Sequence, residues 1–174
     1  MSKRLARMVY GAIAGSVAAA CMTVIRMAAR RRGIIEKTIP QALEERVAHW
    51  SGLGRGAHPV LHHLADQMMH VGYGATLGVG YALVTQRRTG GRSPHGVARG
   101  VAYGVATWFA GSWLLLPALR AKQAAWRKRA SENAVDLLAH LVFGAATAIV
   151  SEELSTQSNR GPTSDSARRA TRVG

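Results

Sequence analysis

Four long apolar runs, separated by arginine-rich segments, divide this chain. The windows nearly free of charge are 8–25, 67–85, 100–119 and 137–151. A soluble helical domain would spread its charges along one face of each helix at a period of 3.6 residues. Three of the runs contain 18 to 20 residues, which is long enough to cross a hydrocarbon layer about 30 Å thick. The fourth has 15 uncharged residues and spans only if the polar turn before it lies among the headgroups.

The pattern therefore predicts an all-α protein, a four-helix transmembrane bundle. Residues 1–154 would form one integral membrane domain, and the polar segment 155–174, which has no apolar period, would be a disordered tail. Short interfacial helices would follow the first and third spans, anchored by Trp50 and Trp126.

The excess of basic over acidic residues is consistent with a membrane protein. A net charge of +14 would suit nucleic acid, but the basic residues flank the apolar runs and no motif that reads RNA or DNA accompanies them. Juxtamembrane Lys and Arg more simply meet anionic lipid headgroups, and Arg26, at the end of the first run, is expected to extend its side chain to them. The single Cys21 lies inside the first run and excludes a disulfide framework. The expected partners are the bilayer and a second copy or a larger membrane complex, with no nucleic acid.

Two halves of the chain share three features in the same order, which predicts a parallel internal repeat of about 1–86 and 95–154. Glycines spaced four apart open the first and third runs, and A-L-x4-A-x-W follows each of them. D-x3-H-x2-[Y/F]-G-A then opens the second and fourth runs. Small residues let transmembrane helices approach closely. The predicted packing glycines are Gly11, Gly15, Gly74, Gly78, Gly96, Gly100, Gly104 and Gly144.

The orientation is set only weakly by charge. The amino end, the 86–99 turn and the tail hold 11 Lys and Arg, against 12 in the other two connections, so the positive-inside rule nearly cancels. The short, arginine-rich 86–99 turn favours both termini in the cytoplasm.

Each Asp-His pair continues as a stripe along one helix face, because residues four apart stack on nearly the same side. The candidate residues for a shared site near one membrane face are His62, Asp66 and His70 in the second span, and Glu132, Asp136 and His140 in the fourth. Ionisable groups in spans usually turn inward, so we expect the second and fourth helices to run side by side and bring these pairs together.

Three interpretations of this cluster stay open. The carboxylates and imidazoles could simply lock the hairpins together as a structural or accessory subunit. They could instead carry a proton or bind a divalent cation, because histidine titrates near neutral pH and His plus carboxylate is a workable ligand pair. His70 and His140 could also be axial ligands of a b-type haem. No serine or cysteine nucleophile lies in a recognisable catalytic setting, so an enzyme is not expected.

The order of features resembles the YagU-like proteins, small bacterial inner-membrane proteins of unassigned function. The resemblance rests on the GxxxG first span, the proline-containing connection, the histidine early in span two and "ENAVDLLAHLVFG" at span four. It implies a four-span inner-membrane protein with cytoplasmic termini. His70 and His140 are the positions that match. An acid at Asp66 departs from the pattern, and the family carries no catalytic residue to transfer.

Overall fold

All regular structure in the described part of the chain is helical. The computed structural model describes residues 2–35, 59–85, 94–115, 118 and 129–159, without the side chains of Lys3, 59–66, Leu115 and Asn159. The helices are α1 (Lys3–Arg31), α3 (Pro59–Val84), α4 (Gly96–Phe109) with its π-helical continuation η2 (Ala110–Leu115), and α6 (Ala130–Asn159). The all-α prediction is confirmed for these residues. The predicted interfacial helices, with Trp50 and Trp126, lie outside them.

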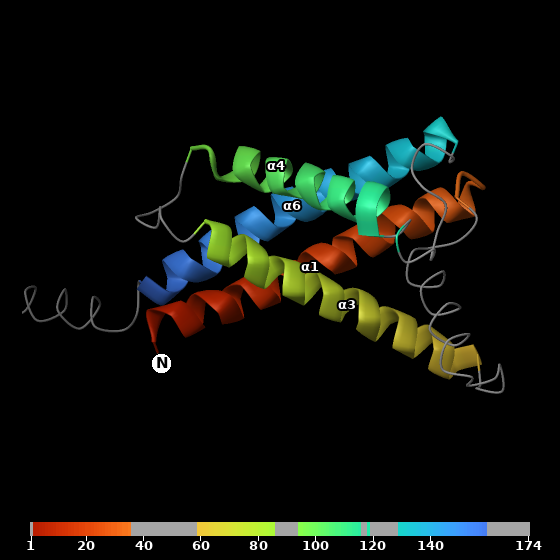
Figure 1. Cartoon of the computed structure of the whole chain (residues 1–174). Coiled ribbons are helices and arrows are strands. Elements are labelled where there is room, and N and C mark those ends of the chain that lie inside the picture. The colour runs from red at the N-terminus through yellow and green to blue at the C-terminus, as the bar shows by residue number, and fades with distance from the viewer. Residues whose placement is uncertain (1, 36–58, 86–93, 116–117, 119–128, 160–174) are drawn as a thin grey trace, which may run out of the picture.

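Two antiparallel helices, α1 and α6, form the centre of the molecule (Figure 1). Helix α3 packs on α1, and α4 packs on α6. The amino terminus, the end of α3, the start of α4 and the end of α6 lie at one end, and α3 and α6 run in the same direction (Figure 1). We call the opposite end, where α1 finishes and α6 begins, the Asp136 end.

The expected lateral packing of the second and fourth helices is wrong, because α3 and α6 meet at only a few positions. Helix α1 lies between them. It presents its glycines to α3 and a second face, with Ala18 and Met22, to Ala139 and Phe143 of α6.

Helix α1 continues past the apolar run and ends in a glycine cap. Gly33 has φ 69°, a left-handed conformation that glycine adopts without strain. Its N–H donates to the carbonyl of Arg30, and the N–H of Ile34 donates to that of Ala29, the pattern of a Schellman motif. The helix therefore carries Arg26 inside its last turns.

Glycines allow α1 and α3 to cross with their backbones in contact. A Cβ placed on Gly11 would lie 2.5 Å from the carbonyl oxygen of Gly78, and one on Gly74 would lie 2.7 Å from that of Gly15. Real Cβ atoms do not approach backbone atoms this closely. Only hydrogen fits at these positions.

The same contact recurs between α4 and α6. A Cβ on Gly100 would meet the carbonyl oxygen of Gly144, and one on Gly104 would meet that of His140. Gly96 differs, because its neighbour is the carboxylate of Glu152. By these contacts Gly78 is equivalent to Gly144.

This register is one helical turn away from the sequence match. Gly15 contacts the backbone of Gly74, and in the other pair of helices the equivalent Gly104 contacts the backbone of His140. The residue of α3 that occupies the position of His140 is therefore Gly74 and not His70. His70 is then the geometric counterpart of Asp136, four residues earlier.

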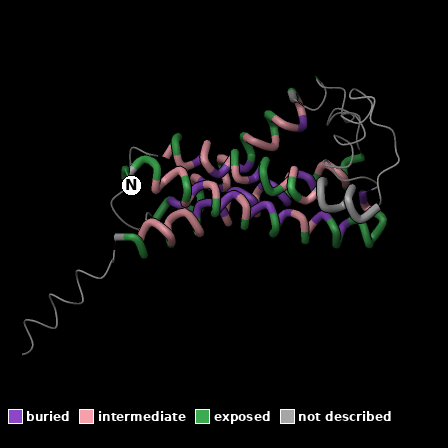
Figure 2. Tube along the Cα trace, turned by 90° about the horizontal axis from the view of Figure 1, so that it is seen from below, coloured by how far each residue is buried: buried purple, intermediate pink, exposed green. Residues whose placement is uncertain are grey.

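Many large apolar side chains are exposed and several polar ones are buried. Figure 2 shows the buried positions running along the middle of the bundle. Arg4–Arg31 and Ala130–Ser158 are long and apolar enough to cross a membrane, yet only 33% and 39% of their apolar windows are buried. The exposed large apolar residues of α1 are Leu5, Val9, Ile13, Val17, Val24 and Met27. The buried polar residues are Arg26, Ser112, Asp136, His140 and Thr147.

Helix α6 extends further than the sequence suggests. Residues 155–159, expected in the disordered tail, are helical. Two hydroxyl groups in this part bond within the helix: Ser155 Oγ donates to the carbonyl of Ser151 at 2.7 Å and Thr156 Oγ1 to that of Glu152 at 2.8 Å. Residues 160–174 lie outside the described part.

Candidate functional site

A buried ion pair joins the two central helices. Arg26 Nη2 of α1 lies 2.9 Å from Asp136 Oδ1 of α6, and the two residues are 2% and 1% exposed. The N–H bonds of Nη2 are not aligned with the carboxylate for a hydrogen bond, so the contact is mainly electrostatic. Breaking a buried pair by removing one partner leaves an uncompensated charge, so this contact fixes α1 against α6.

Two imidazoles flank the ion pair. His140, one turn after Asp136, has its Nδ1 2.7 Å from the backbone carbonyl oxygen of Asp136. That carbonyl can only accept, so Nδ1 carries the proton. His70 of α3 faces the carbonyl of Ala19 on α1, and its buried Nε2 has no hydrogen-bond partner.

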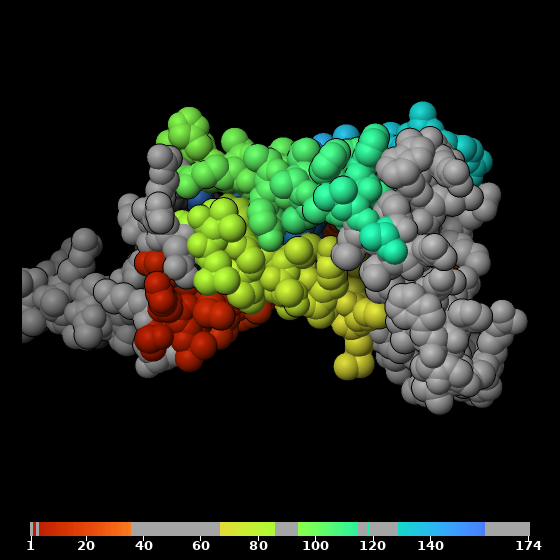
Figure 3. Space-filling model, in the orientation of Figure 1, coloured from red at the N-terminus to blue at the C-terminus, as the bar shows by residue number. Residues whose placement is uncertain are grey.

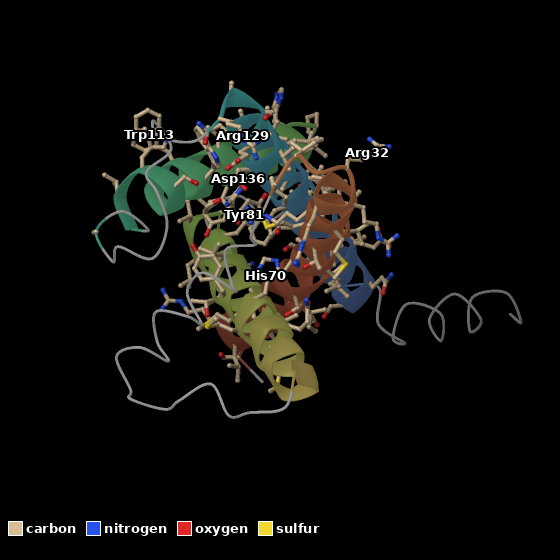
Figure 4. The ribbon with its side chains drawn as sticks, turned by 90° about the vertical axis from the view of Figure 1, so that its right-hand side faces the viewer. Arg32, His70, Tyr81, Trp113, Arg129 and Asp136 are labelled. Atoms are coloured by element: carbon tan, nitrogen blue, oxygen red, sulfur yellow. The ribbon has the colours of Figure 1, made fainter. Side chains whose placement is uncertain are left out.

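The guanidinium of Arg26 is close enough to act electrostatically on both imidazoles, and His70 is close enough to act on His140. His70 and His140 therefore lie in one charged region although α3 and α6 barely pack. Figure 4, which looks along the bundle from the Asp136 end, shows His70 and Asp136 within the ring of helices. We call the set Arg26, His70, Asp136 and His140 the charged layer.

Of the other predicted site residues, Glu132 is the one whose side chain is described, and it pairs outside this layer. Glu132 Oε1 accepts a hydrogen bond from Arg129 Nε at 2.8 Å, in a partly exposed pair at the start of α6. His62 and Asp66 lie in the first turns of α3, where only the backbone is described. Among the described side chains no group of three or more His, Cys, Asp or Glu could hold a metal ion.

The end of α4 adds polar groups at the same level of the bundle. Trp108 Nε1 and Ser112 Oγ are buried without hydrogen-bond partners. Ser112 lies in η2, and Trp108 stands edge-on to Trp113, with 6.5 Å between ring centroids. π-Helical turns inside α-helices occur frequently at functional sites.

A tyrosine links the two outer helices. Tyr103 Oη of α4 donates a hydrogen bond to the carbonyl oxygen of Leu77 on α3 at 2.7 Å. Its ring also meets that of Tyr81 edge-on, with 5.3 Å between centroids. Beyond this link, the described residues of α3 and α4 make little contact.

Removing this hydroxyl should have a small effect. We expect Tyr103→Phe to lower the free energy of unfolding by about 0.6 kcal/mol, within the usual contribution of one hydrogen bond between helices. Thermal melting in detergent measures the change, with Tyr10→Phe on α1 as the control. A loss no larger than that of the control would show that the bond does not hold α3 to α4.

Arg26 is the functional residue that sequence reasoning missed. Its place at the edge of an apolar run indicated a side chain among lipid headgroups, and that expectation is wrong. The signal that could have found it is Asp136, an acid directly before the fourth apolar run, which needs a cation if it is buried.

Comparison of the chain with known protein families, with curated proteins and with solved structures finds no match. The charged layer is therefore interpreted from its own chemistry.

Proposed function

We propose that this chain is a polytopic membrane protein in which α1, α3, α4 and α6 all cross the bilayer. The support is the distribution of side chains, with large apolar residues outside and charged residues inside. Hydroxyl groups donate hydrogen bonds within their own helices. Thr23 Oγ1 donates to the carbonyl oxygen of Ala19 at 3.0 Å, and Thr147 Oγ1 donates to that of Phe143 at 2.8 Å. Groups in lipid require such internal partners.

The proposal includes a tandem repeat of two helical hairpins in a bacterial inner membrane, with both termini in the cytoplasm. The two equivalent glycine contacts support the repeat. The weak charge bias and the YagU-like resemblance support the location. Tags at each terminus, with a reporter active on only one side of the membrane, test the orientation.

Within that membrane protein, the charged layer handles protons as part of a transport or envelope-homeostasis role. The observation that carries this proposal is a buried Arg26–Asp136 pair with two imidazoles beside it. Protonation of His140 adds a positive charge next to Arg26. The added repulsion weakens the contact between α1 and α6, so proton binding is coupled to helix packing.

The charged groups that face His140 come from three helices. They are Arg26 of α1, His70 of α3 and Asp136 of its own helix. Helix α4 contributes no charge here, because the residue that it packs against the backbone of His140 is Gly104. Within the described layer, the imidazoles of His70 and His140 are therefore the groups whose ordinary pKa lies near neutral pH.

A proton suits this layer better than a metal ion or haem. A divalent cation bound by Asp136 and His140 would have to approach the guanidinium of Arg26, which already neutralises the carboxylate. Ferric haem between His70 and His140 would meet the same positive charge, and the backbone of α4 packs directly on His140. The residues present do not fit a porphyrin.

Proton uptake into liposomes tests the proposal. Purified protein is reconstituted with a pH-sensitive dye inside, and a potassium gradient with valinomycin drives protons inward. Wild type should take up protons faster than empty liposomes, and His140→Gln should fall to the level of empty ones. His95→Gln, at the opposite end of the bundle, should behave like wild type. Equal uptake by wild type and empty liposomes would reject proton handling.

A structural or accessory subunit is the second candidate. It is favoured by the ion pair and the glycine contacts, which hold α1 against two neighbours at once. A pull-down in mild detergent should then recover stoichiometric membrane partners while liposomes show no uptake. Recovery of the chain alone would count against this role.

A further inference from the structure

A row of residues leads away from the charged layer along one side of α3. His70, Tyr73, Leu77 and Tyr81 follow one another at spacings of three or four residues, which places them on one face of the helix. From His70 to Tyr81 the helix rises by about 16 Å. This face therefore carries phenol side chains from the level of the charged layer towards the opposite end of the bundle.

Tyr103 of α4 fills the position in this row where α3 has a leucine. Its Oη donates to the carbonyl oxygen of Leu77 at 2.7 Å, and a Cβ on Gly80 would lie 2.9 Å from it. Its ring meets that of Tyr81 with 5.3 Å between centroids, and Tyr73 is close enough to act on it electrostatically. The three tyrosines are therefore neighbours in space, and we call them the tyrosine column.

A carboxylate lies at the far end of the column. Glu152 of α6 is partly exposed and packs its carboxylate on Gly96, the first residue of α4. Tyr81 is 5% exposed, and both Glu152 and Arg99 are close enough to act on it electrostatically. Asp136 directly precedes the fourth apolar run and Glu152 directly follows it. The two acids therefore mark the two ends of one span.

We propose that Glu152 is a second proton-binding group and that the tyrosine column carries protons between it and the charged layer. This inference rests on proton handling by the layer and extends it to a route across the bilayer. A hydroxyl can accept a proton at its oxygen while its own proton leaves to the next acceptor, so no phenol keeps a charge. At the far end the proton neutralises the carboxylate of Glu152, whose partial exposure allows its release.

The side of the bundle that holds the column is the side on which such a route can form. Proton transfer requires a donor and an acceptor within hydrogen-bond reach or joined by one water molecule. Figure 3 shows the surface hollowed between α3 and α4, which make little contact apart from the Tyr103 link. Between α1 and α6, the space next to the layer is filled by apolar side chains that cannot relay a proton, those of Ala18, Met22, Ala139 and Phe143.

Proton uptake by liposomes, with the same dye and potassium gradient, tests the route. Tyr81→Phe keeps the ring beside Tyr103 and removes one hydroxyl. Glu152→Gln keeps the size of the side chain and removes the titrating group. Both variants should fall to the uptake of empty liposomes. Glu152→Asp retains a carboxylate and should stay above that level.

Matched controls exist for both positions. Glu153→Gln changes the next residue, an exposed acid whose Oε1 accepts a hydrogen bond from Gln157 Nε2 at 3.1 Å. Tyr10→Phe removes a hydroxyl on α1. Both controls should take up protons as wild type does. Thermal melting shows that each variant is folded, and Tyr103→Phe, which costs little stability, is a further variant that should lose uptake.

The outcomes separate this inference from proton handling by the layer. Wild-type uptake in Tyr81→Phe and Glu152→Gln, beside a loss in His140→Gln, would overturn the route and leave the layer as the proton site. Equal loss in Glu152→Asp and Glu152→Gln would assign Glu152 a structural role and overturn the second proton site. Uptake lost in Glu152→Gln but unchanged in Tyr81→Phe and Tyr103→Phe would overturn the column. No uptake by wild type would reject proton handling itself, and the route with it.

Discussion

Replacing Asp136 with alanine is expected to destabilise the folded bundle by about 3–5 kcal/mol, because it leaves the buried guanidinium of Arg26 without its counter-charge. The free energy of unfolding in mixed detergent micelles measures the effect. Glu132→Ala is the matched control on the same helix. Its partner Arg129 is 57% exposed, and an exposed pair of this kind contributes about 0.2–1 kcal/mol.

A double variant identifies the cause of the loss. Arg26→Met combined with Asp136→Leu removes both charges and keeps apolar volume, so much of the stability should return. Proton uptake should stay absent in this variant, because the paired charges are gone. If Asp136→Ala is no more destabilising than Glu132→Ala, the ion pair does not hold α1 against α6.

Replacing Gly78 with isoleucine should separate α1 from α3. A Cβ at this position would overlap the carbonyl oxygen of Gly11 and lie 2.8 Å from Cα of Gly15. Overpacking costs about 1–3 kcal/mol where side chains can adjust. Here the obstacle is backbone, so we expect at least about 3 kcal/mol, measured by thermal and detergent unfolding.

Gly72 provides a control on the same helix. A Cβ there meets nothing within 4 Å, so Gly72→Ile adds the same apolar surface without a clash. This variant should fold as wild type does, and its own helix should gain slightly because glycine is a poor helix former. Equal destabilisation by Gly72→Ile and Gly78→Ile would mean that the loss comes from glycine itself and not from the contact with α1.

The helices could be predicted from the sequence because apolar runs and small-residue spacing are local patterns. The runs 8–25 and 137–151 fall inside α1 and α6. Both helices are longer than the runs, and α1 ends only at the glycine cap of Gly33. The spacing that singled out Gly15 and Gly78 is likewise a pattern within one helix.

Which helices become neighbours could not be predicted in the same way. The shared D-x3-H motif aligned His70 with His140, whereas backbone contact aligns His70 with Asp136. The neighbours of each helix depend on which face of α1 packs against α3 and which packs against α6, because α1 contacts both helices. The pairing of Arg26 with Asp136 depends on that choice, so Asp136 signals that a cation is needed but does not identify Arg26 as that cation.

The position of the ion pair in the chain also has a consequence for biosynthesis. Arg26 leaves the ribosome with the first helix, but Asp136 emerges only with the last. Until Asp136 is synthesised, no carboxylate from it neutralises the positive charge of Arg26, and an unpaired charge in hydrocarbon is unfavourable. On the proposed membrane location, the final burial of the first helix is therefore coupled to the synthesis of α6.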